Sequence, residues 1–447
     1  MIPPSTIAAI STPYGQGAIA LVRMSGTRCK EILSACWKGK SVDSFSPRTA
    51  QFGKILSEQD TVLDEILVTW FPAPHSYTGE DTIEISCHGG ILVVKIILDR
   101  LYTCGATPAE PGEFTQRAFL NGKMDLTQAE AVMDILSAQS TLALKAAQEQ
   151  LDGSLGTRIK EQTRTVLDIL AHVEAHIDFP DEDITPAAND ALLEKSRTVI
   201  RSIDSLLSTA DRGRLLREGV RTVLAGSPNV GKSSLLNLLL GYDRAIVSNT
   251  PGTTRDTLEE VIHLNGFALR LIDTAGIRQS DDHIEQAGIQ RTEKALDRAD
   301  LVIEVVDASV PRQDNHLSIE GAHHILLLNK ADLGIHPDWN DSIGIPFSCK
   351  TGQGEKELTE AISSLLTEQS LPDKQSSLIA INTRHQHCLK LAQKSMTTAV
   401  EGLQEMMSPE FVALDLREAL NYLGEITGKV DTEDVLGQIF SSFCIGK

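Results

Sequence analysis

The chain has 447 residues, too many for one ordinary hydrophobic core, so we expect two to four domains. Hydrophobic residues make up 41% and charged residues 23%, as in globular proteins, and a formal net charge of −20 excludes a basic nucleic-acid footprint over the chain as a whole. Seven cysteines, an odd number without a CxxC pair, exclude a disulfide framework and favour reduced thiols.

Residues 1 to about 120 alternate short β-like runs with turns. The longest apolar run, ILVVKIIL at 91–98, is too short to span a bilayer, and the first residues lack a signal-peptide pattern. We therefore expect a cytoplasmic protein without membrane contact. Residues 1–120 are predicted to form a mixed α/β domain, from the β-like runs AIALVRMSG at 18–26, EILVTWF at 65–71 and TIEISCHGG at 82–90 and a helical stretch at 91–104.

Two helical segments flank a central region. Residues 121–214 carry apolar residues at helical spacing, and residues 374–447 return to the same pattern. The acidic run DFPDEDITP at 178–186 interrupts the first segment. Its carboxylates suggest a metal site, but its two prolines favour a solvated linker. We expect one helical domain, split by an inserted domain at 215–373.

The inserted domain alternates strand-like and helix-like runs, which predicts a largely parallel, doubly wound sheet. The segment GSPNVGKS at 226–233 fits the phosphate-loop pattern G-x-x-x-x-G-K-S and follows the strand-like RTVLA. Its glycines let backbone N–H groups turn toward a phosphate at a helix N-terminus. We expect Lys232 to reach the β- and γ-phosphates and Ser233 to ligate Mg²⁺.

Two further elements concern the metal and the γ-phosphate. TTRD at 253–256 offers Thr254 as a second hydroxyl ligand of Mg²⁺. DTAG at 273–276 places Asp273 to hold Mg²⁺ through water and Gly276 to sense the γ-phosphate. Both stand in the order along the chain that a GTPase requires.

The last two elements concern the base. NKAD at 329–332 supplies Asp332, which can accept hydrogen bonds from guanine N1–H and the 2-amino group. Adenine offers neither donor, so it would leave this carboxylate unpaired, which is costly in a dry site. SCK at 348–350 is expected to close over the base. Together the motifs predict a P-loop GTPase rather than a generic ATPase.

The predicted site binds GTP or GDP with Mg²⁺. After DTAG comes Ile277, where Ras-like enzymes place a glutamine that orients the attacking water. An apolar side chain cannot do this, so another group and another cation must act. The motif residues assigned to the nucleotide are Asn229, Val230, Gly231, Lys232, Ser233, Ser234, Thr253, Thr254, Asp273, Thr274, Ala275, Gly276, Asn329, Lys330, Asp332 and Ser348.

Taken together, these segments resemble the tRNA-modification GTPase MnmE (TrmE) family over essentially the whole chain. Besides the GTPase motifs, the resemblance rests on TGEDTIEISCHGG at 78–90, PGEFTQRAFLNGKMDLTQAEA at 111–131, HIDFPDEDI at 176–184 and the final GQIFSSFCIGK. It implies a homodimer whose N-terminal domain resembles folate-binding aminomethyltransferases. It also implies an FAD-binding partner of the MnmG type, joined in a heterotetramer or larger complex, with tRNA bound mainly through that partner.

The resemblance further implies the reaction: an aminomethyl or carboxymethylaminomethyl group is added at C5 of the tRNA wobble uridine. The carbon comes from a tetrahydrofolate one-carbon derivative, 5-formyl or 5,10-methylene. GTP hydrolysis in the family occurs when two G domains pair across a K⁺, which takes the place of an arginine finger. By resemblance, the K⁺ ligands are Asn229, Ser248, Thr250 and Thr253, and Glu285 orients the water. Pro251 departs from the expected Ala.

By resemblance, the folate site contains Arg23, Glu80, Lys123 and Lys447. Each residue taken alone could be an ordinary surface charge. Cys444 stands fourth from the end, at the position of a prenylation cysteine, but Lys447 is not a residue that a prenyltransferase accepts at the last position. We expect a reduced thiol at the folate site, whose role as nucleophile, proton donor or packing residue stays open.

Two other functions compete with this interpretation. A ribosome-assembly or translation-type GTPase would have a similar G domain, but would not usually carry some 215 preceding residues or end in CIGK. A net charge of −20 also disfavours tight direct RNA binding. The other alternative is a folate-dependent methyltransferase that carries the G domain as a regulatory insert.

Overall fold

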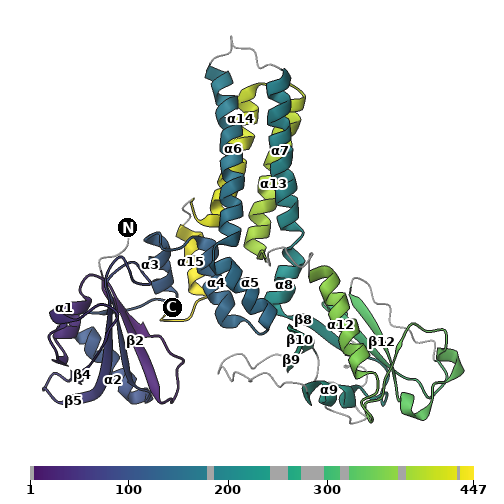
Figure 1. The fold of residues 1–447 in the computed structure, drawn as a ribbon, viewed down its shortest axis with the longest axis horizontal. Coiled ribbons are helices and arrows are strands. Elements are labelled where there is room, and N and C mark those ends of the chain that lie inside the picture. The colour runs from purple at the N-terminus through teal and green to yellow at the C-terminus, as the bar shows by residue number, and fades with distance from the viewer. Residues whose placement is uncertain are drawn as a thin grey trace. The chain divides into compact units, whose positions relative to one another are not determined.

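The computed structural model describes residues 5–178, 186–241, 260–272, 296–312, 322–370, 379–429 and 433–446. Within them the chain forms two compact units. Figure 1 labels their helices and strands. The first comprises residues 1–133, 155–167 and 417–447, and the second comprises residues 134–154 and 168–416. In the described part of the chain, no helix is both long and apolar enough to cross a bilayer.

The first unit is built on a seven-stranded mixed sheet in the order β3-β4-β5-β6-β2-β1-β7. All neighbours are antiparallel except β1 and β7, which pair in parallel. The strands are β1 (Ile7–Ile10), β2 (Ile19–Ser25), β3 (Trp37–Gly39), β4 (Ala50–Leu56), β5 (Val62–Phe71), β6 (Thr82–His88) and β7 (Thr107–Pro108).

One face of this sheet is buried because apolar residues alternate along its strands. Val22 and Met24 of β2 and Ile83 and Ile85 of β6 are fully buried, and α2 adds Ile97 to the same core. Helices of this unit are α1 (Cys29–Ser34), α2 (Ile91–Thr103), α3 (Glu113–Leu120) and α15 (Glu433–Ser441), with a 3₁₀ turn at Val42–Ser44. Helix α4 (Leu126–Ser137) begins in this unit.

The second unit contains a six-stranded sheet in the order β13-β12-β11-β8-β10-β9. Only β9 and β10 pair antiparallel, so the predicted largely parallel sheet is confirmed. The strands are β8 (Val220–Ala225), β9 (Glu260–Leu264), β10 (Phe267–Ile272), β11 (Leu301–Asp307), β12 (His323–Asn329) and β13 (Ile345–Pro346). Helices α9 (Lys232–Gly241) and α12 (Glu355–Ser370) contribute leucines and an isoleucine to its core.

The helical part of the second unit contains long amphipathic helices. Helix α13 (Thr383–Gln404) buries Leu389, Ala392, Met396 and Leu403, spaced three, four or seven apart, and packs along α7 (Pro186–Leu207). A capping box at Asn382 starts α13, because side chain and backbone groups of Asn382 and His385 satisfy each other's hydrogen bonds. The remaining helices are α5 (Thr141–Leu151), α6 (Ser154–Asp178), α8 (Ala210–Glu218) and α14 (Pro409–Thr427), with 3₁₀ turns at Ala331–Leu333 and Pro337–Trp339.

The predicted fold class is therefore confirmed. A region with a mixed sheet comes first in the chain, and the doubly wound sheet that follows is preceded and followed in sequence by helical segments. The predicted domain limits at 120, 214 and 373 stay predictions. The linker predicted at 178–186 lies almost wholly outside the described residues.

Candidate functional sites

The phosphate loop joins β8 to α9, and its glycines are required by close backbone packing. Gly226 has φ +135°, and a Cβ there would lie 2.1 Å from the carbonyl oxygen of Val305. Gly231 has φ +107°, and its Cβ would lie 2.2 Å from Nδ2 of Asn329. Any other residue would force these segments apart. The glycines of the motif thus allow the loop to turn tightly against two neighbouring strands.

Lys232, the first residue of α9, turns its ammonium back into this loop. Its Nζ donates to the carbonyl oxygens of Gly226 and Ser227, both at 2.7 Å. Burial lowers the pKa of Lys232 from its ordinary value. Ser233 and Ser234 in the first turn of α9 are exposed.

Asn329 connects the loop to the base-recognition segment. It ends β12, is buried, and donates from Nδ2 to the carbonyl oxygen of Val230 at 2.6 Å. Its Oδ1 accepts from the backbone N–H of Cys349 at 3.2 Å. The sequence assigned Asn329 to the nucleotide, whereas the structure shows its side chain holding together three segments of the site.

The base-recognition segment begins with Lys330 in the left-handed region at φ 63°. Its Nζ lies 2.6 Å from Oδ2 of Asp307, at the end of the neighbouring strand β11. Burial opposes ionisation of Asp307, but hydrogen bonds from Lys330 and Ser309 outweigh it and lower the pKa of this carboxyl. The ion pair fixes the backbone turn that presents the next residues.

Asp332 is exposed, and its Oδ1 accepts a 2.6 Å hydrogen bond from the Ser348 hydroxyl. The Ser348 hydroxyl also accepts from the backbone N–H of Thr351 at 3.3 Å, which fixes the direction of its own proton. Among the described residues, no hydrogen bond reaches the other oxygen of Asp332. The structure thus brings together the phosphate loop, NKAD and SCK, as predicted from their order in the chain.

Several predicted site residues lie outside the described residues. They are Ser248, Thr250, Thr253, Thr254, Asp273, Thr274, Ala275, Gly276, Glu285 and Lys447. Their assignment to Mg²⁺, K⁺, the γ-phosphate, the water and the folate stays a prediction. Asn229, the K⁺ ligand expected in the phosphate loop, is exposed and adopts φ 61°.

In the N-terminal region, Arg23 on β2 has a side chain that is only 15% exposed. Its Nε and Nη2 donate to Oε1 of Glu84 at 3.0 and 2.8 Å. The guanidinium carbon lies 5.5 Å from the ring centre of Tyr77 and 5.8 Å from that of Phe114. Arg23 is therefore held by one carboxylate and two aromatic rings.

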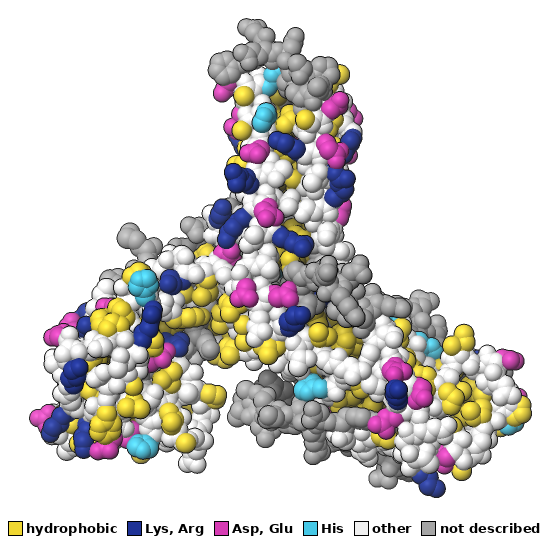
Figure 2. All heavy atoms as spheres, in the orientation of Figure 1, with side chains coloured by type: hydrophobic (Ala, Val, Ile, Leu, Met, Phe, Trp, Pro, Cys, Tyr) yellow, Lys and Arg dark blue, Asp and Glu magenta, His cyan; other side chains and the backbone are white. Residues whose placement is uncertain are grey.

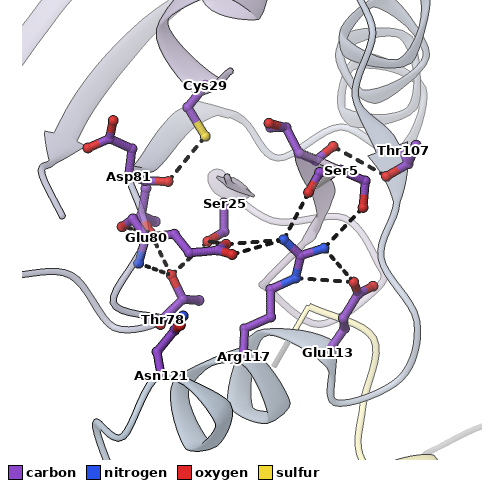
Figure 3. A network of polar contacts seen from close by, with 12 residues as sticks. Ser5, Ser25, Cys29, Thr78, Glu80, Asp81, Thr107, Glu113, Arg117 and Asn121 are labelled. Atoms are coloured by element: carbon purple, nitrogen blue, oxygen red, sulfur yellow. Dashed lines mark hydrogen bonds and ion pairs between the residues drawn. The ribbon is translucent and has the colours of Figure 1, made fainter. Parts of the chain in front are cut away.

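Glu80 lies in a polar network that the sequence did not predict (Figure 3). Its Oε2 accepts from the Ser25 hydroxyl at 2.8 Å and from Nη1 of Arg117 at 3.1 Å. Arg117 on α3 is 1% exposed and also pairs with Glu113. Glu113 and Arg117 both stand in the motif PGEFTQRAFLNGK. Their spacing of four residues, which allows an ion pair on a helix, was the feature of the sequence that could have indicated this contact.

Lys123 follows α3 and is exposed, and its Nζ donates to the carbonyl oxygen of Pro74 at 3.0 Å. A Cβ on Gly79 would lie 3.4 Å from Cγ of Lys123, so the lysine stem runs beside the residue that precedes Glu80. Lys123 and Glu80 thus belong to adjoining segments, as expected for one site.

Cys444 is exposed, and its carbonyl oxygen accepts from the backbone N–H of Gly112 at 3.4 Å. Gly112 is the residue immediately before α3 and has φ 68°. Two positions further, the carbonyl oxygen of Gly446 accepts from the Ser11 hydroxyl at 3.1 Å. The C-terminal segment therefore lies against the loop that follows β1 and against the start of α3.

Comparisons with known proteins identify the family of the chain. The family described as MnmE helical domain matches residues 126–444, and the family described as GTP-binding protein TrmE N-terminus matches residues 6–123. The tRNA modification GTPase MnmE of Akkermansia muciniphila is 60% identical and covers 100% of this chain and 99% of its own. The protein of the same name from Clostridioides difficile is 43% identical and covers 99% of both chains.

Among solved structures, the G domain of the FeoB iron transporter of T. maritima matches 34% of this chain and 98% of its own. The identity is 30% and the TM-score is 0.25, and we conclude nothing from a score this low. The match to the TrmE N-terminus covers the region that a ribosome-assembly GTPase would not usually carry. On the family matches and the full-length relatives, the chain belongs to the MnmE family of tRNA-modification GTPases.

Proposed function

We propose that this GTPase acts with an FAD-binding partner of the MnmG type to add an aminomethyl or carboxymethylaminomethyl group at C5 of the tRNA wobble uridine. The observation that carries its GTP-dependent part is the side chain of Asn329, which joins the phosphate loop to the NKAD and SCK segments through Val230 and Cys349. The carboxylate of Asp332, proposed to recognise guanine, would thus lie at a fixed distance from a nucleotide bound by the loop.

In the nucleotide site, each described residue has a task that fits its place. The backbone N–H groups of the loop would bind the phosphates, and Lys232 would exchange its two carbonyl acceptors for phosphate oxygens. The exposed hydroxyl of Ser233 suits Mg²⁺, and the exposed amide of Asn229 suits K⁺. These cations would supply positive charge to the developing transition state.

Replacing K⁺ by Na⁺ tests the proposed potassium dependence. We expect GTP turnover to fall strongly in NaCl at equal ionic strength, while GDP affinity stays the same. The variant Glu285→Ala should keep GTP affinity and lose turnover, because it removes the group proposed to orient water. Equal turnover in the two salts, or full turnover by Glu285→Ala in KCl, would refute this part of the proposal.

In the N-terminal region, we propose a site for a tetrahydrofolate one-carbon derivative. Glu80 offers a carboxylate to pterin N–H donors, and Arg23, Lys123 and Lys447 offer cations to the glutamate tail. Cys444 is exposed, and its backbone carbonyl oxygen contacts Gly112, the residue before α3, the helix that carries Arg117. We expect Cys444→Ser to abolish tRNA modification without changing thermal unfolding.

The decisive experiment for the whole reaction is mass spectrometry of tRNA nucleosides from a deletion strain. Loss of the C5 side chain at the wobble uridine, restored by the wild-type gene and not by the Cys444→Ser gene, would support the proposal. Intact tRNA together with altered ribosomal particles would favour a ribosome-assembly GTPase.

We propose that the protein works as a homodimer in a heterotetramer or larger complex, with tRNA bound mainly through the partner. On the face drawn in Figure 2, acidic and basic side chains are interspersed along the helices. A net charge of −20 favours contact with a basic partner over direct contact with RNA. Mixing this chain with the flavoprotein should therefore raise tRNA affinity well above that of this chain alone.

A further inference from the structure

Arg117 stands at the centre of the network around Glu80 (Figure 3). Its Nη1 donates to the carbonyl oxygen of Ser5 at 2.9 Å and lies 3.3 and 3.1 Å from Oε1 and Oε2 of Glu80. Its Nη2 donates to the Ser5 hydroxyl at 3.2 Å and to Oε1 of Glu113 at 2.7 Å. Its Nε donates to the same Glu113 oxygen at 3.2 Å.

These contacts occupy the whole guanidinium. Its five N–H groups have acceptors on Ser5, Glu80 and Glu113, and the side chain is only 2% exposed. A lysine in the same place would offer three N–H groups from one atom, so it could not reach acceptors on opposite sides. The geometry therefore specifies arginine and not merely a positive charge.

The charges of this network do not cancel. One guanidinium faces the two carboxylates of Glu80 and Glu113, whose side chains are 17% and 13% exposed. A surplus negative charge this poorly hydrated is costly unless further donors reach it. Ser25 supplies one donor to Glu80 and the backbone N–H of Glu110 supplies one to Glu113, and the Glu80 side chain, 17% exposed, can meet more.

We propose that Arg117 is a positioning residue, which fixes the Glu80 carboxylate so that its open edge receives paired N–H donors of a ligand. The ligand class is a heterocycle with a guanidine-like edge, such as the 2-amino-4-oxo edge of a pterin, whose adjacent N–H groups match the two oxygens of a carboxylate. This inference rests on the folate site proposed above and adds the residue that orients the carboxylate.

The arrangement of α3 supports a positioning role over simple packing. Glu113 and Arg117 lie one turn apart on α3, so Glu113 restrains the guanidinium from the side opposite Glu80. Ser5 restrains it from a third direction, through both its carbonyl and its hydroxyl. Three restraints on one planar group leave it a single orientation, and Glu80 takes its orientation from it.

The test is a double-mutant cycle with 5-formyltetrahydrofolate as probe, measured by calorimetry on the full chain. We expect Arg117→Lys to weaken binding roughly ten- to hundredfold, the effect of one lost hydrogen bond to a charged group. Glu80→Gln should weaken it by a similar factor. The double variant should bind about as weakly as Glu80→Gln alone, because Arg117 acts through Glu80.

Matched variants separate positioning from general damage. Arg28→Lys changes an arginine that is exposed and pairs with Glu31, and should bind like the wild type. If Arg117→Lys fails to fold, Glu113→Ala serves instead: it should weaken binding about tenfold by freeing the guanidinium on one side. Glu113→Gln should restore part of the binding, because its oxygen can still accept from Nε and Nη2, although its NH₂ group would face the backbone N–H of Glu110.

The outcomes distinguish this inference from the proposed function. Wild-type affinity in Arg117→Lys, or losses that simply add in the double variant, would overturn the positioning role and leave the folate site standing. Absence of probe binding by the wild-type chain would overturn the folate site, and the positioning role with it.

Discussion

The change Asp332→Asn should reverse the base preference of the nucleotide site. Ser348 already donates to Oδ1 of Asp332, so a bound guanine would use the remaining oxygen and lone pairs for N1–H and the 2-amino group. The asparagine side-chain oxygen can accept a hydrogen bond from one of these donors. The asparagine NH₂ group would face the other donor, and two donors cannot form a hydrogen bond. Hydrogen bonds to a charged group contribute about 1.5–3 kcal/mol each, so we expect a loss of about 2–4 kcal/mol. GTP affinity should then fall roughly 30- to 1000-fold.

Xanthine carries a carbonyl where guanine carries the 2-amino group, and the asparagine NH₂ can donate to it. The variant should therefore bind XTP more tightly than GTP, as measured by competition against a fluorescent GDP analogue in Mg²⁺ and KCl. Asp341→Asn is the matched control, because it makes the same change at an exposed position in the same unit. If Asp332→Asn kept GTP affinity within about threefold of the control, the assignment of Asp332 to the base would be wrong.

Three further predictions concern the loop, a buried cation and a buried thiol. Gly231→Ala should weaken GDP binding at least tenfold (about 1.4 kcal/mol), because its Cβ would clash with Asn329, whereas Gly241→Ala has open space and should bind normally in the same titration. Arg212→Met should raise the free energy of unfolding by about 1–3 kcal/mol in a urea titration. The reason is that Nε and Nη2 of this buried arginine have no hydrogen-bond partner among the described residues. A lower free energy of unfolding in the variant would show that the guanidinium does have a hydrogen-bond partner. Burial and the nearby Asp64 raise the pKa of the Cys87 thiol to about 11, so its contribution to stability is complete below about pH 9 and is lost as the pH rises toward 11. Between these pH values the free energy of unfolding should fall more steeply in the wild type than in Cys87→Ala, and parallel slopes would contradict this pKa.

The phosphate loop, NKAD and SCK segments could be located from the sequence because each is local in it. Each motif is a short run at a strand end, and parallel strands place their carboxyl ends at one edge. Asp307 and Asn329 are direct neighbours on β11 and β12 in the structure. The ion pair of Lys330 with Asp307 could not be predicted, because it depends on a left-handed turn at Lys330.

The N-terminal site was less predictable because its contacts join distant segments. Arg117 contacts Ser5, 112 positions away, and Glu80, 37 positions away. Nothing in the local sequence says that an arginine with charged neighbours will be 1% exposed. From sequence alone, a single charged residue is assigned to the surface, because charged side chains are rarely buried. The order of the strands could have corrected this, but the parallel pairing of β1 with β7 joins residues about a hundred positions apart.

The hydrogen bond between Ser11 and Gly446 joins residues 435 positions apart. Ribosomes add about 5–20 residues per second, so the first strand leaves the exit tunnel roughly 20–90 s before its C-terminal neighbour is made. During that interval the surface around Ser11 and Gly112 is incomplete, although the phosphate loop, NKAD and SCK segments are made before Cys444. A chain released prematurely would therefore lack the C-terminal segment that lies against the loop after β1 and the start of α3.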